Sequence, residues 1–89
     1  MIRHPFSPQA DKALRALSAE NRKRAAKAFQ RSQENPRHPS LNLERLRGHQ
    51  NLYSIRISIS HRAILRRVEG ADNSYELVDI DPHDIYRGL

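Results

Sequence analysis

The chain has 89 residues, a length that fits one domain with one modest hydrophobic core, so residues 1–89 are expected to form a single domain. It contains no cysteine, which excludes disulfides and thiolate metal sites. No apolar run approaches the length of a membrane span or a signal-peptide core, and we therefore expect a soluble, cytoplasmic protein that does not bind membranes.

The positive charge is concentrated in the first three quarters of the chain. Residues 1–67 carry 15 basic and 4 acidic side chains, whereas residues 68–89 carry 1 basic and 6 acidic ones. Thirteen of the 16 cations are arginine, whose planar guanidinium binds phosphate with two parallel hydrogen bonds. This composition favours a nucleic acid as partner. A GC-rich genome with a solvated protein surface would explain the charge equally well.

The first half of the chain predicts a short strand followed by two helices. Residues 2–6 have strand character, and Ser7 and Pro8 suit the N-cap and first position of a helix over about 8–17. Its apolar stripe consists of Ala10, Ala13, Leu14 and Leu17. Ser18 is a second N-cap candidate for a helix over about 19–34, which Asn35 and Pro36 end.

The second helix has two chemically different sides. Its expected apolar side holds Ala25, Ala26 and Phe29, and its basic side holds Arg22, Lys23, Lys27 and Arg31. The two helices are thus expected to form a hairpin with a basic outer surface. For most of these charges a solvated face is the simpler interpretation.

The second half of the chain predicts an antiparallel meander. Residues 35–51 form a loop, and from Leu52 onward the apolar residues Tyr53, Ile55, Ile57 and Ile59 alternate with Ser54, Arg56, Ser58 and Ser60. Further strands are expected over 61–68 and 75–80, with a turn at 70–73. The fold class is therefore α+β, a sheet of about four strands that includes the N-terminal one, with both helices on one face.

Three stretches resemble the RelE/ParE superfamily of type II toxin–antitoxin toxins, most closely its HigB-like members. They are the loop 43–48, the strand pair 53–57 and 61–65, and the terminal segment 83–87. The resemblance implies a concave basic sheet face, metal-free cleavage of mRNA on the ribosome, and a cognate antitoxin as protein partner. No metal and no cofactor are implied.

The same resemblance supplies a set of catalytic candidates. Arg56 and Arg62 match its two strand arginines, and His83, Asp84 and Tyr86 occupy the place of its C-terminal catalytic residues. Metal-free RNA cleavage needs a base for the 2′-hydroxyl, cations for the charge on phosphorus, and an acid for the leaving 5′-oxygen. The two arginines suit the second role. His83 suits acid or base, Asp84 could orient it or act as base, and Tyr86 could donate a proton or stack on a nucleobase.

Structural roles for the same residues stay open at this point. The arginines could be exposed strand residues or pair with Asp79 or Asp81, and the His83–Asp84 pair could be a structural hydrogen bond. Additional RNA-binding candidates are Arg45, Arg47, His49, His61 and Arg66. The family usually has Tyr or Trp where this chain has His61, which leaves the identity of the base open.

Two other functions are compatible with the sequence. One is a ParE-like toxin that inhibits DNA gyrase by contact, which would have no need of the terminal His-Asp-x-Tyr set. The other is a basic nucleic-acid-binding module without catalytic activity, whose affinity would fall steeply with salt.

Overall fold

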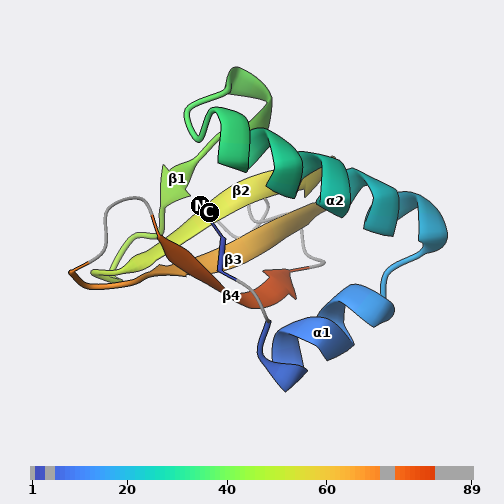
Figure 1. The fold of residues 1–89 in the computed structure, drawn as a ribbon, viewed down its shortest axis with the longest axis horizontal. Coiled ribbons are helices and arrows are strands. Elements are labelled where there is room, and N and C mark those ends of the chain that lie inside the picture. Colours follow the sequence, from blue (N-terminus) through green and yellow to red (C-terminus); the bar gives the residue numbers. More distant parts are fainter. Residues whose placement is uncertain (1, 4–5, 71–73, 82–89) are drawn as a thin grey trace.

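The computed structural model describes residues 2–3, 6–70 and 74–81. In chain order its elements are α1 (Pro8–Arg15), α2 (Ala19–Glu34), the short 3-10 helix η1 (Pro39–Leu41), β1 (Glu44–Arg45), β2 (Leu52–Ser58), β3 (His61–Arg67) and β4 (Tyr75–Asp81). The strands form one antiparallel sheet in the order β1-β2-β3-β4 (Figure 1). The predicted α+β class is confirmed. Among the described residues, no helix is long and apolar enough to cross a membrane.

Both helices begin at the predicted serine caps. The Ser7 hydroxyl accepts a hydrogen bond from the Ala10 backbone N–H at 3.2 Å, and the Ser18 hydroxyl accepts one from Asn21 at 3.1 Å. Helix α1 ends at Arg15, two residues earlier than predicted, although Leu17 still packs against the core. Local capping signals therefore set where the helices start.

The buried side of α2 is rotated relative to the prediction. Ala25, Ala28 and Ser32 are buried, in the i, i+3, i+7 spacing of one helix face, whereas Ala26 is exposed. Phe29 is half-buried and contacts Phe6 edge-to-face, with 5.9 Å between ring centroids. The packing of α2 on β2 selects this face.

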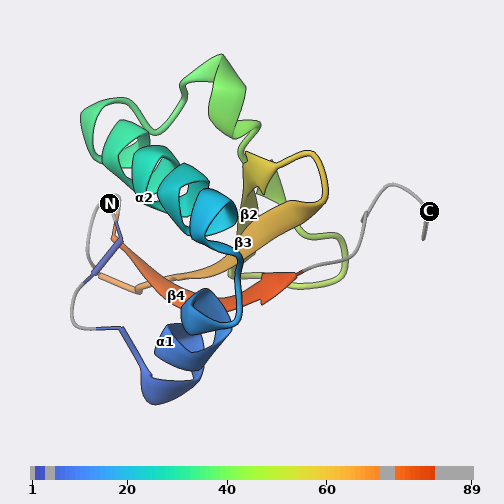
Figure 2. The ribbon, with the colours of Figure 1, turned by 90° about the vertical axis from the view of Figure 1, so that its right-hand side faces the viewer.

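One hydrophobic core joins both helices to one face of the sheet. Helix α2 packs on β2 and α1 on β4. The core contains Ala10 and Ala25 together with Ile55, Leu65, Leu77 and other residues that point to this face. Figure 2 shows the two helices on the same side of the sheet. The opposite face of the sheet is not covered by a described helix.

The fourth strand differs from the predicted one. In the N-terminal segment predicted as a strand, the described residues make one parallel bridge, between Ile2 and Tyr75. The strand at the other edge is β1, within the segment predicted as a loop, and it pairs only with Tyr53 and Ser54 of β2. The edge of β2 beyond Ser54 therefore faces no other strand in the described part of the chain.

A β-bulge in β4 allows two apolar residues of this strand, Leu77 and Ile80, to point into the core. Ile64 pairs with Asp79 and Leu65 pairs with Leu77, so Val78 is an extra residue on β4. As a result Leu77 and Ile80, three positions apart, both point into the core. Regular alternation would place them on opposite faces.

The predicted wet and apolar faces of β2 need two corrections. Ile59 was expected on the buried face but is 94% exposed, because β2 ends at Ser58 and Ile59 lies in the turn. Ser54 and Ser58 were expected on the wet face, yet both are buried. On that face of β2, Arg56 is exposed.

Candidate nucleic-acid interface

Arg56 and Arg62 occupy the same rung of the sheet. Their Cα atoms are partners in the β2–β3 pairing, and residues directly opposite each other project from the same face. That face is the one away from the helices, because the neighbouring residues Ile55 and Ala63 belong to the core. The register thus brings the two strand arginines together, as their proposed role requires.

The two side chains nevertheless have different surroundings. Arg62 is buried, with only 3% of its surface exposed. Its Nε donates a hydrogen bond to the Ser54 hydroxyl at 2.9 Å, and one terminal nitrogen donates to the Asn42 carbonyl oxygen. The same nitrogen lies 3.9 Å from the Glu44 carboxylate. Arg62 therefore reaches past β2 to the residues at β1, and its contact with Ser54 accounts for the burial of that serine.

Arg56 instead lines a cleft of about 400 Å³ between α2 and the open edge of β2. We call it the α2–β2 cleft, and its lining residues are Arg24, Lys27, Ala28, Arg31, Ser40, Leu41, Arg56, Ile57, Ser58 and Ile59. The cleft exists because β1 is too short to cover β2 beyond Ser54.

Among the described residues, four cations and no carboxylate line the α2–β2 cleft. Arg24 forms an exposed ion pair with Glu20 at 2.8 Å, and Arg31 donates a hydrogen bond to the Ser40 hydroxyl at 3.1 Å. Lys27 and Arg56 make no side-chain hydrogen bond or ion pair with another described residue. The cleft can therefore offer two unpaired cations, flanked by two partly engaged ones, to an anionic ligand.

The contribution of α2 to this cleft was missed by the sequence analysis. Lys27 and Arg31 were interpreted as part of a solvated helix face, and Arg24 was not considered. The available signal was the i, i+3/i+4, i+7 spacing of these three cations along one side of the helix.

The other RNA-binding candidates do not converge on Arg56. Arg45 is exposed on β1, while Arg47 and His49 are exposed in the turn that follows it. The Nδ1 atom of His61 lies 3.1 Å from the hydroxyl oxygens of both Ser58 and Ser60, so this histidine is engaged within the β2–β3 turn.

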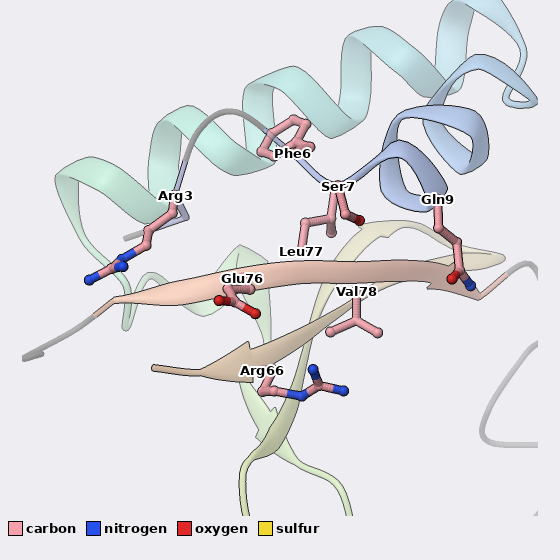
Figure 3. A pocket seen from close by; sticks show the side chains of 8 residues that line it. All are labelled: Arg3, Phe6, Ser7, Gln9, Arg66, Glu76, Leu77 and Val78. Atoms are coloured by element: carbon pink, nitrogen blue, oxygen red, sulfur yellow. The ribbon is translucent and has the colours of Figure 1, made fainter. Parts of the chain in front are cut away.

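Arg66 lies on the sheet face away from the helices, beside a second cavity. Figure 3 shows it on the opposite side of the strands from Phe6 and Ser7. The cavity, of about 500 Å³, is also lined by Arg3 and Glu76. Because a carboxylate shares this lining, it is less suited to an anion than the α2–β2 cleft.

The C-terminal candidates His83, Asp84 and Tyr86 lie outside the described residues. The last described residue, Asp81, is the Cα partner of Arg62, which in turn is the partner of Arg56. Strand β4 therefore ends on the rung that carries both strand arginines. Within the ranges that the structure describes, no three His, Asp or Glu side chains are grouped as a metal site would require.

Comparisons with known proteins give matches in structure but not in sequence. No family model matches the chain, and no curated protein matches its sequence. A YoeB/ParE toxin from Agrobacterium tumefaciens superposes with a TM-score of 0.69 at 18% identity, covering 88% of this chain and 94% of the toxin. The chain has the fold of the RelE and ParE toxins.

Two further structures support this assignment of the RelE fold. A RelE–RelB complex from Pyrococcus horikoshii matches with a TM-score of 0.67 and 21% identity over 86% of this chain and 89% of that one. The isolated RelE toxin of E. coli matches with a TM-score of 0.66 and 21% identity over 93% and 88%. The structural similarity therefore spans most of the chain.

Proposed function

We propose that this chain is the toxin of a type II toxin–antitoxin pair and that it cleaves mRNA on the ribosome without a metal ion. The observation that carries the proposal is the position of Arg56, which lies in a cleft of four cations on a RelE fold and makes no ion pair with another described residue. A carboxylate-free cleft suits a phosphodiester, whose negative charge the guanidinium and ammonium groups would neutralise.

In this proposal Arg56 binds the scissile phosphate and stabilises the extra negative charge of the pentacoordinate phosphorus. A base removes the proton of the 2′-hydroxyl, whose oxygen attacks phosphorus, and an acid protonates the departing 5′-oxygen. The products are a 2′,3′-cyclic phosphate and a 5′-hydroxyl. His83, Asp84 and Tyr86 are the proposed proton-transfer groups, as the sequence resemblance implies.

The strand register supports the proposed position of these groups. Asp81 ends β4 on the rung of Arg62 and Arg56. Two residues of extended chain span at most about 7 Å, which limits how far the Cα atom of His83 can lie from that of Asp81. In the same proposal Arg62 is a positioning residue, since its guanidinium is held by Ser54 and Asn42.

The proposed protein partner is an antitoxin that neutralises the toxin. Three of the matched structures are complexes of RelE with RelB, from Pyrococcus horikoshii, Methanococcus jannaschii and E. coli. An acidic antitoxin segment would complement the four cations of the α2–β2 cleft.

The decisive experiment maps the 5′ ends of messages in a translation reaction that contains ribosomes and the purified chain. We expect new 5′ ends with the unaltered chain and a loss of about 100-fold in cleavage rate for Arg56→Gln and His83→Ala, the size of effect typical of removing one transition-state donor. Arg15→Gln, which removes an exposed arginine on α1 remote from the cleft, is the matched control and should cleave normally.

Other outcomes would replace the proposal. Undiminished cleavage by both variants would show that these residues are not the active site. Inhibition of gyrase supercoiling with intact translation would identify a ParE-like gyrase inhibitor. Retention of RNA without any cleavage, together with intact translation, would identify a non-catalytic binding module.

A further inference from the structure

A third cavity combines arginine with tyrosine at the opposite end of β2. Its volume is about 330 Å³, and we call it the Tyr–Arg pocket. The residues that line it are Pro36, Arg37, Leu43, Arg45, Tyr53, Arg67 and Tyr75. It shares no lining residue with the α2–β2 cleft, so variants can alter one cavity without touching the other.

Strand pairing builds this pocket. Arg45 is the Cα partner of Tyr53 between β1 and β2, and Arg67 is the partner of Tyr75 between β3 and β4. Each of these arginines therefore projects from the same face as its tyrosine. The two tyrosine rings pack edge-to-face, with centroids 5.4 Å apart. Arg37, from the loop after α2, adds the third cation.

The three guanidinium groups are available to a ligand. All three arginines are exposed, and no side-chain hydrogen bond or ion pair links them to another described residue. None of the described residues that line the pocket carries a carboxylate. Three like charges around one small cavity repel one another, and an anion bound between them would relieve this repulsion.

Tyr75 adds a neutral hydrogen-bond donor to these charges. Burial raises the pKa of its phenol, with a smaller upward effect from Tyr53, while Arg67 and Arg37 act in the opposite direction. The hydroxyl therefore stays protonated at neutral pH. Arg37 and Arg67 line the same pocket as this phenol.

We propose that the Tyr–Arg pocket binds a phosphoryl group, supplied either as inorganic phosphate or as the terminal phosphate of an oligonucleotide. A single carboxylate would neutralise only one of the three guanidinium groups. A phosphate monoester carries nearly two charges at neutral pH and three acceptor oxygens, which match several guanidinium forks and a hydroxyl donor. This site does not depend on the proposed RNA cleavage, since it includes none of its proposed catalytic residues.

The test is an NMR titration of the arginine Nε–H and tyrosine ring signals at constant ionic strength. Inorganic phosphate replaces chloride, and a short oligonucleotide is added with or without a 5′-phosphate. We expect saturable shifts at Arg37, Arg45, Arg67 and both tyrosines. Arg45→Gln and Arg67→Gln should each weaken phosphate binding by about tenfold, the effect of losing one charge-assisted contact. Arg15→Gln should leave it unchanged within about twofold.

Each outcome decides part of the proposal. Tighter binding of the 5′-phosphorylated oligonucleotide than of its dephosphorylated counterpart identifies an RNA end as the source, and binding of inorganic phosphate alone identifies the free ion. Shifts that do not saturate, or an equal loss in Arg15→Gln, would overturn the site. So would saturation by a polyglutamate peptide but not by phosphate. Thermal melting of each variant checks that it is folded. If a variant unfolds, the presence or absence of saturable shifts in the unaltered chain tests the site.

Discussion

At the scale of single residues, Arg56 and Arg62 show that strand alternation predicts the direction of a side chain but not its burial. Both lie on the same rung and face. The sequence pattern predicted this direction for Arg56 correctly. It could not predict that Arg62 is enclosed, because its partners Ser54, Asn42 and Glu44 come from β2, the segment before β1, and β1.

This contrast predicts different effects on stability. Arg62→Gln should lower the free energy of unfolding by about 2–3 kcal/mol, because it leaves the buried Ser54 hydroxyl and the Asn42 carbonyl oxygen without their donor. Arg56→Gln should change it by less than about 0.5 kcal/mol, as expected of an exposed side chain. Urea denaturation followed by circular dichroism measures both. Equal destabilisation by the two variants would contradict the difference in burial.

At the scale of elements, local signals predicted the long helix and the three long strands, whereas tertiary contacts determined the rest. Ser18 and Asn35 bound α2 as predicted, and β2 and β3 follow their apolar pattern. Strand β1 was missed because two residues, Glu44 and Arg45, are too few to show a period. It forms through pairing with β2, which involves residues about ten positions away in the sequence.

The cap of α2 provides a test at this scale. Ser18→Ala should lower the free energy of unfolding by about 1 kcal/mol, because the Asn21 N–H loses its acceptor at the helix start. Ser74→Ala, a change of the same chemistry just before β4, removes a hydroxyl that caps neither α1 nor α2 and should have little effect. Thermal unfolding monitored by circular dichroism compares the two. Similar melting temperatures for both variants would show that the cap contributes little.

At the scale of the whole molecule, the fold gathers seven cations in two cavities that no described carboxylate lines. The α2–β2 cleft gathers Arg24, Lys27 and Arg31 from a helix with Arg56 from a strand 25 to 32 positions later in the sequence. The Tyr–Arg pocket gathers its cations from a loop and two strands. The sequence predicted a basic surface and an anionic partner class. It could not predict these groupings, because they depend on how α2 crosses the sheet and on where β1 ends.

The proposed role of the cleft predicts a salt dependence. The logarithm of the affinity for single-stranded RNA should fall linearly with the logarithm of salt concentration, and Lys27→Gln should reduce the slope by about 0.7, the value for one lost phosphate contact. Lys12→Gln, which changes an exposed side chain of α1 that does not line the cleft, should not change the slope. Fluorescence anisotropy over a series of salt concentrations measures the slopes. An unchanged slope for Lys27→Gln would place the RNA elsewhere.

The bulge at Val78 makes the last strand tolerant of a change in length at one position. Deleting Val78 would place Leu77 and Ile80 two positions apart, so both would still point into the core while Asp79 and Asp81 would stay on the outer face. Deleting Glu76 instead would put Tyr75 and Leu77 on opposite faces, although both belong to the core. Homologous chains whose last strand differs in length by one residue should therefore have the gap at the bulge.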